Sequence, residues 1–208
     1  MKSRKTSGPK AAPRRYRAQP AAKIALKLPI PPRKRLEPDM QRYFAVCDEK
    51  LGFLPNVLEV YSFDATKLRA FVDMYNDLMF GESSLSTLER EMIAVVVSAA
   101  NGCYYCLTAH GQAVRELSGD PSLGEALVMN YRVAQVTRRQ RAMLDFAHRL
   151  TVAPAETGAA ERRALRRAGF TDRDIWDICS VTAFFNMTNR IATPTDMMPN
   201  EQYLAANR

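Results

Sequence analysis

The stretch from residue 86 to residue 110, STLEREMIAVVVSAANGCYYCLTAH, decides the fold. It opens on Ser86, and Glu89 follows three residues later, which is the capping-box pattern of a helix start. An apolar run then leads to Asn101-Gly102, a pair that is typical of a helix end. We therefore predict one helix before this pair and a second helix that begins at Cys103.

Similar helix signals recur on both sides of this stretch. Between them, apolar residues repeat at the spacing of one helix face, and no segment has the alternation of a half-buried strand. The sequence therefore predicts an all-α fold, a helical bundle in which a helix–turn–helix carries the site. The expected helix starts are at Pro38, Asp64, Asp120-Pro121, Thr137 with Gln140, and Thr171 with Asp174, and the expected breaks are at Gly52, Pro55, Gly81 and Gly169.

Length and composition fit a single soluble domain. The chain has 208 residues, of which 47% are hydrophobic and 25% are charged, as in ordinary globular proteins. No apolar run is long enough to predict a transmembrane helix. The N-terminus lacks the apolar region of a secretory signal, so we expect a cytoplasmic protein.

The formal net charge of +8 is concentrated at the N-terminus. Residues 1–35 hold twelve Lys or Arg and no acidic residue, which leaves 18 of the 30 basic residues against 22 acidic ones in the rest. This basic stretch cannot bury enough apolar surface to order itself. We expect residues 1–27 to be a disordered tail and residues 28–208 to be the helical domain. Nucleic-acid binding is not expected, because the domain has no recognition motif.

Two of the four cysteines, Cys103 and Cys106, stand close together. Residues three or four apart lie on one face of a helix, so both thiols and His110 are expected to be neighbours. Two such thiols can form a disulfide. The attacking species must be a thiolate, which a helix N-terminus and a nearby histidine both favour. Cys47 and Cys179 are isolated, and we predict that they are core residues.

Glu91 is the acidic residue that can orient His110. In one unbroken helix it would lie about 18 Å from Cys103 along the axis. The predicted turn at Asn101-Gly102 allows the two helices to pack together, so that Glu91 can orient His110 directly or through water. The sequence thus indicates a base with an orienting carboxylate beside a pair of thiols.

Glu91, Cys103-Tyr104-Tyr105-Cys106 and His110 together resemble the active-site pattern of alkylhydroperoxidase D. The resemblance implies that Cys106 attacks the peroxide and that Cys103 resolves the product as a disulfide. It also implies that His110 and Glu91 relay protons. Alkylhydroperoxidase D has a histidine just before the second cysteine, where this chain has Tyr105. Either the relay is reduced here or Tyr105 donates a hydrogen bond in its place.

The resemblance extends to the uncharacterised peroxidase-related enzymes of the same superfamily, which also contains the carboxymuconolactone decarboxylases. It covers nearly everything from about residue 27 onward. It implies an antioxidant, peroxiredoxin-type enzyme that forms a homo-oligomer and needs no metal or other cofactor. An external dithiol, from a lipoyl-protein or a thioredoxin-like protein, would reduce the disulfide. The stretches that carry this resemblance are residues 52–57, 88–94, 130–132 and 184–190.

Other interpretations of these residues stay open. Zinc could bind Cys103, Cys106 and His110, with Glu91 or His148 as the fourth ligand. The cysteines could also be purely structural in a binding module. A general disulfide reductase and a decarboxylase of the same superfamily are the alternative enzymes, although the cysteine pair argues against the decarboxylase.

Three polar residues near the C-terminus receive no chemical role from the sequence. Asn186, Asn189 and Arg190 are expected to cap a helix, to pack, or to bridge subunits. We therefore predict that they are structural.

Overall fold

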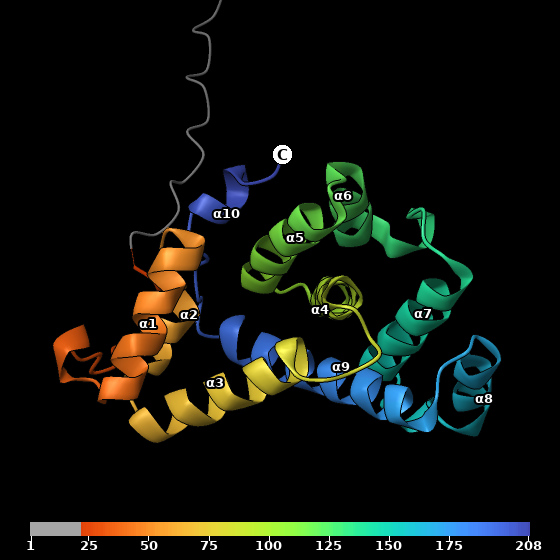
Figure 1. Ribbon diagram of the computed structural model, residues 1–208, viewed down its shortest axis with the longest axis horizontal. Coiled ribbons are helices and arrows are strands. Elements are labelled where there is room, and N and C mark those ends of the chain that lie inside the picture. Colours follow the sequence, from red (N-terminus) through yellow and green to blue (C-terminus); the bar gives the residue numbers. More distant parts are fainter. Residues whose placement is uncertain (1–21) are drawn as a thin grey trace, which may run out of the picture.

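Every regular element that the structure describes is a helix. The computed structural model describes residues 22–208, and no strand occurs in that range, so the predicted all-α class is confirmed (Figure 1). None of the helices in this range has the length and hydropathy needed to cross a membrane. The α-helices are α1 (Pro38–Leu51), α2 (Asn56–Tyr61), α3 (Ala65–Phe80), α4 (Thr87–Asn101), α5 (Tyr104–Ser118), α6 (Pro121–Asn130), α7 (Arg138–Val152), α8 (Ala159–Arg167), α9 (Asp172–Ala192) and α10 (Gln202–Ala205), and short 3₁₀ helices cover Arg33–Arg35, Tyr131–Val133 and Pro154–Glu156.

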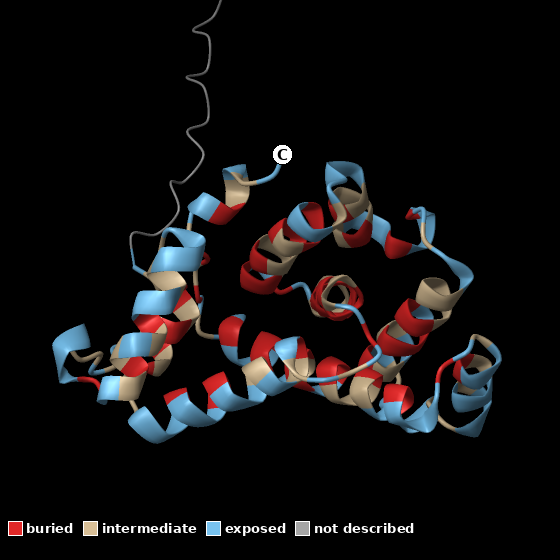
Figure 2. Cartoon of the chain, viewed as in Figure 1, coloured by how far each residue is buried: buried red, intermediate tan, exposed pale blue. Residues whose placement is uncertain are grey.

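Helix α4 runs through the middle of the bundle. Figure 1 looks almost along its axis and shows α5, α6, α7 and α9 arranged around it, and α4 packs against all four. Every residue from Glu89 to Ser98 is buried, as the colouring of this helix in Figure 2 shows. A helix that is apolar on nearly all sides is stable only inside a core. The other helices therefore cover α4.

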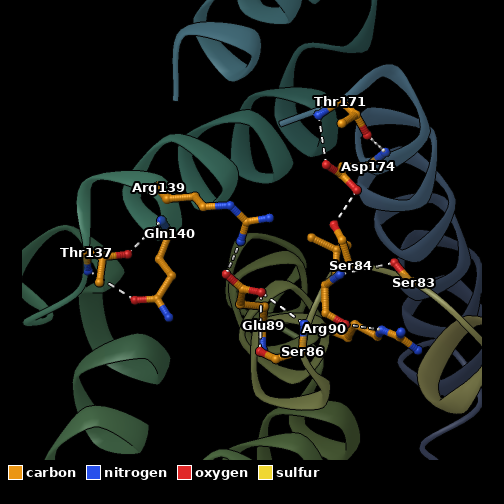
Figure 3. Close-up of polar contacts among 11 residues, drawn as sticks. Ser83, Ser84, Ser86, Glu89, Arg90, Thr137, Arg139, Gln140, Thr171 and Asp174 are labelled. Atoms are coloured by element: carbon orange, nitrogen blue, oxygen red, sulfur yellow. Dashed lines mark hydrogen bonds and ion pairs between the residues drawn. The ribbon is translucent and has the colours of Figure 1, made fainter. Parts of the chain in front are cut away.

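Capping boxes are present at the starts of α4, α7 and α9, at the residues predicted to begin these helices. In each box the cap side chain accepts a hydrogen bond from a backbone N–H in the first turn. This N–H belongs to the third residue of the helix. The side chain of the same residue accepts a hydrogen bond from the backbone N–H of the cap residue. The pairs are Ser86 with Glu89, Thr137 with Gln140, and Thr171 with Asp174 (Figure 3).

Side chains also tie these three helix starts to one another (Figure 3). Arg139 on α7 donates to Glu89 on α4 at 2.5 Å. Ser84, just before α4, donates to Asp174 in the first turn of α9. The residues that cap each helix therefore also hold the helix ends together.

Helices α2 and α10 are not predicted by the sequence. Asn56, the first residue of α2, follows directly on a predicted break. Its backbone N–H donates to the side chain of Asn200 at 2.7 Å, and its side-chain amide donates to the carbonyl of Met198 at 2.9 Å. These partners are 144 and 142 residues away along the chain. No local pattern could reveal them.

The predicted tail overlaps the described part of the chain by only a few residues. Its residues 1–21 lie outside that part. Within the overlap, the backbone N–H of Ala25 donates to the carbonyl of Thr195, and the backbone N–H of Met198 donates to the carbonyl of Lys23. Both hydrogen bonds are 2.9 Å long. The division of the chain into tail and domain stays a prediction.

The left-handed turn after α4 can be tested by substitution. Gly102 has a φ of 65°, and a Cβ added there would meet no atom within 4 Å. We expect Gly102→Ala to lower the free energy of unfolding by about 1–2 kcal/mol, because L-residues disfavour this conformation. Gly102→Asn should cost less, since asparagine tolerates it. Urea unfolding measures both values, and an alanine variant as stable as the unmodified protein would refute this account.

Candidate active site

The turn at Gly102 brings α5 back against α4. Cys103 is the N-cap of α5, and its backbone N–H donates to the carbonyl of Ser98 at 3.0 Å. As a result, Nδ1 of His110 lies 2.6 Å from Oε2 of Glu91. The two residues expected to cooperate are therefore in direct contact, without an intervening water.

The Glu91–His110 pair is shielded from solvent. The side chains are 5% and 12% exposed, respectively. A carboxylate can only accept, so Nδ1 carries the shared hydrogen and Nε2 is left to exchange a proton with another group. The ring of Phe185 stands edge-on to the imidazole, with 4.6 Å between centroids. The histidine is thus fixed both in its tautomer and in its plane.

Cys103 and Cys106 hydrogen-bond to each other through their thiols. Donation from the Cys106 side chain lowers the pKa of Cys103 to about 6, against the effect of burial. The same hydrogen bond, together with burial, raises the pKa of Cys106. In the reduced pair the first thiolate therefore forms on Cys103. The attack by Cys106 that the family resemblance implies stays a prediction.

Helix α9 and its C-cap residue, Thr193, supply polar side chains to the two sulfurs. Thr193 hydrogen-bonds Cys103, whereas Thr188 and Asn189 hydrogen-bond Cys106. The sequence does not assign these contacts, and it predicts a structural role for Asn189. The signal in the sequence that could have pointed to Asn189 was the family resemblance of residues 184–190. Helix spacing alone cannot show that α9 meets the start of α5.

Tyr105 stands where alkylhydroperoxidase D has a histidine. Its hydroxyl oxygen accepts the backbone N–H of Val57 on α2 at 3.0 Å. Burial raises the pKa of Tyr105, so this side chain is a phenol at neutral pH. A phenol has a hydrogen to donate as well as an oxygen that accepts.

A cavity of about 500 Å³ reaches the candidate residues. Cys106 lines it together with Glu91, Tyr105 and His110, whereas Cys103 lines a second hollow of about 410 Å³ beside Thr193. A ligand in the main cavity therefore meets the thiol of Cys106. The aromatic side chains that line this cavity are Tyr43, Tyr61, Phe71, Tyr75, Phe80, Tyr105, Phe184, Phe185 and Tyr203.

The two isolated cysteines pack against the core, as predicted, but both are only partly buried. Cys47 also lines the main cavity. Burial raises the pKa of each thiol. Neither is therefore a ready thiolate at neutral pH.

The zinc interpretation finds no geometric support. Nowhere in residues 22–208 do three His, Cys, Asp or Glu side chains group in a way that could hold a metal ion. Glu91, a possible fourth ligand, contacts His110 directly. His148, the other one, lies on α7 against the ring of Tyr131, with 5.3 Å between centroids.

Comparison with known proteins shows the family of this chain. The carboxymuconolactone decarboxylase family matches residues 67–149. An uncharacterized peroxidase-related protein from Silicibacter sp. TM1040 is 60% identical, with a TM-score of 0.88, over 92% of this chain and 99% of that one. The chain therefore belongs to the superfamily of the alkylhydroperoxidase D-like proteins and the carboxymuconolactone decarboxylases.

Two further solved structures are similar. An uncharacterized peroxidase-related protein from Ralstonia eutropha JMP134, described as an alkylhydroperoxidase AhpD core, is 38% identical, with a TM-score of 0.86, over 90% of this chain and 97% of that one. The debrominase Bmp8 is 21% identical with a TM-score of 0.70, over 81% of this chain and 89% of that one, which shows a shared fold alone. None of the curated proteins matches the sequence.

The order of ionisation within the thiol pair can be measured. The ultraviolet absorbance of thiolate, followed against pH, should show a first step near the Cys103 pKa of about 6. Cys106→Ala removes the largest cause of this lowered pKa, so the step should move towards the ordinary thiol value of about 8.5. Cys179→Ala is the control and should leave the step in place. A first step at about 8.5 in the unmodified protein would contradict the shared hydrogen bond.

Proposed function

We propose that the protein is a thiol-dependent reductase of organic hydroperoxides with an antioxidant role. One observation carries the proposal: Cys106, hydrogen-bonded to a second thiol, lines an apolar cavity together with the buried Glu91–His110 pair. The superfamily to which the chain belongs supports it, as do two relatives described as peroxidase-related.

Cys106 is the proposed attacking residue, because it lines the cavity with His110. Its thiol hydrogen lies in the hydrogen bond to Cys103, so transfer of that proton to Cys103 leaves the thiolate on Cys106. This thiolate attacks the distal oxygen of the hydroperoxide, and the O–O bond breaks. Cys106 becomes a sulfenic acid, and the alkoxide leaves as an alcohol after it takes the Nε2 proton of a protonated His110, whose ring is left neutral with its hydrogen on Nδ1.

Cys103 is the proposed resolving residue. The Cys103 thiol attacks the sulfur of the Cys106 sulfenic acid and loses its proton, and the hydroxyl group leaves with that proton as water. The two thiols thereby supply both electrons that reduce the peroxide, and the pair ends as a disulfide. An external dithiol, carried by a lipoyl-protein or a thioredoxin-like protein, then returns two electrons and two protons.

The groups around Cys106 have roles that follow from their contacts. Glu91 holds the tautomer of His110 and stabilises the positive charge when that ring is protonated, as an orienting carboxylate does for a general base. Tyr105, a phenol held by Val57, can donate to the oxygen that becomes negative when the O–O bond breaks. No metal or other cofactor takes part in this scheme.

The cavity favours a bulky apolar substrate. Its volume of about 500 Å³ and its aromatic walls suit a branched alkyl or aryl hydroperoxide better than hydrogen peroxide. Phe80 and Leu117, which line it, are 62% and 47% exposed. Such exposed apolar side chains are consistent with a homo-oligomer. A homo-oligomeric state and a cytoplasmic location are parts of the same proposal.

The decisive experiment counts thiols before and after one equivalent of tert-butyl hydroperoxide. We expect rapid loss of two thiols, a mass decrease of two hydrogens, and a Cys103–Cys106 linkage in the tryptic map. Cys106→Ser should not react, whereas Cys179→Ser, the control, should react like the unmodified protein. Inert thiols in the unmodified protein would refute the proposal, and turnover of disulfides faster than of peroxides would favour a general disulfide reductase.

Glu91→Gln tests the proton relay. The variant keeps the shape of the side chain but loses the negative charge, so we expect kcat for hydroperoxide to fall by about 10²-fold, the scale of general acid–base catalysis. Glu116→Gln is a matched control, because Glu116 lines the same cavity and contacts Gln112 instead of His110. Steady-state kinetics measures both, and an undiminished kcat in Glu91→Gln would rule out the relay.

A further inference from the structure

A chain of side-chain amides connects α9 and α4 and ends at the sulfur of Cys106. Asn101 donates to the oxygen of Asn186 at 3.1 Å and to the oxygen of Asn189 at 3.0 Å. Asn189 donates to the hydroxyl of Ser98 at 3.1 Å and also hydrogen-bonds Cys106. Asn189 is 1% exposed, so it has to satisfy its polar atoms within the protein.

The direction of this chain is set at its far end. The amide nitrogen of Asn186 donates to the backbone carbonyl of Thr182 at 3.0 Å, and a carbonyl can only accept. Its amide oxygen accepts from the guanidinium of Arg190 at 2.5 Å, and a guanidinium can only donate. Asn186 therefore has one possible amide orientation, with its oxygen towards Asn101.

The orientation of Asn189 follows from that of Asn186. Because Asn186 presents an oxygen, Asn101 must present its NH₂ group, and the second hydrogen of that group goes to the oxygen of Asn189. The NH₂ group of Asn189 then faces Ser98 and Cys106. One of its hydrogens goes to Ser98 at 3.1 Å, which leaves the other for the hydrogen bond with Cys106 that lowers the pKa of this thiol.

The other α9 side chain at this sulfur does not act in the same way. The hydroxyl of Thr188 also lowers the pKa of Cys106. Its single hydrogen is already donated to the carbonyl of Phe185 at 3.1 Å, so Thr188 has to give up that bond to donate to the sulfur. The titratable groups around the sulfur are Cys103, Tyr105 and His110 on α5, Glu91 on α4 and Tyr61 on α2. Asn189 differs from them in that it is an uncharged donor whose orientation does not change with pH.

We propose that Asn189 is a catalytic residue, whose N–H donates to the Cys106 sulfur and stabilises the thiolate that attacks the peroxide. This inference rests on the proposed function, in which Cys106 is the residue that attacks the peroxide. The donor is pre-oriented by Asn101 and Asn186, so it needs no rearrangement when the charge forms on the sulfur. A hydrogen bond to a charged group of this kind is worth about one pKa unit of the thiol.

The test measures the ionisation of Cys106 without any peroxide. In a Cys103→Ser background, where Cys106 titrates alone at the site, the thiolate absorbance is followed against pH. Asn189→Asp keeps the shape of the side chain but removes the N–H, so the midpoint should rise by about one unit or more. Asn189→Ala should shift it in the same direction. At pH 7 the rate of Cys106 alkylation by iodoacetamide should fall about tenfold.

A stability-matched control separates this role from packing. Thr151→Val removes the hydroxyl that accepts from Asn186 at 3.0 Å, at the far end of the same network. We expect it to lower the Tm and to leave the midpoint of Cys106 unmoved. An unchanged midpoint in both Asn189 variants would overturn the inference.

A second measurement needs no substitution at residue 189. In the Cys103→Ser protein, the side-chain amide resonances of Asn189 in a ¹⁵N–¹H spectrum should shift with the same midpoint as the thiolate absorbance. Resonances that do not respond would overturn the inference even if the variants fail to fold. If the midpoint shifts as expected but the unmodified protein does not reduce hydroperoxides, the proposed function fails and the role of Asn189 in the thiol's ionisation stands.

Discussion

Helix α4 is buried on every side, and each charged residue within it must find a partner inside the protein. A buried charge that loses its partner typically costs about 3–5 kcal/mol, which is a large part of the stability of a domain. Glu89 is paired with Arg139 on α7, and Arg90 donates to three backbone carbonyls. Glu91 is paired with His110 on α5. These contacts of Glu89, Arg90 and Glu91 determine how the neighbouring segments pack against α4.

Only one of the three pairings can pass a proton on to another group. The partners of Glu89 and Arg90 are a guanidinium and backbone carbonyls, whereas the imidazole of His110 has a second ring nitrogen that can take up or release a proton. His110 and Glu91 also line the main cavity. The same requirement that builds the core thus places an acid–base pair where a ligand can meet it.

One of the two thiols has the lowered pKa, and the other lines the main cavity. Cys103 has the lower pKa because it receives the Cys106 hydrogen bond and lies at the N-cap of α5, but Cys106 lines the main cavity. Shifting one shared proton moves the charge to the accessible sulfur. The N–H that we propose Asn189 on α9 donates to Cys106 makes that shift easier. Reactivity in this arrangement depends on three helices rather than on the Cys-x-x-Cys motif alone.

Sequence by itself determined most of the helix starts, the break at Gly102 and the proximity of Cys103, Cys106 and His110, because caps and helix faces depend on residues two to four positions apart. It also placed Glu91 correctly as a partner of His110, since a single predicted turn separates their helices. Only the tertiary structure decided what surrounds the thiols. The contacts of Asn189 with Ser98 and of Tyr105 with Val57 span 91 and 48 residues. Such contacts arise when helices pack, and no local periodicity encodes them.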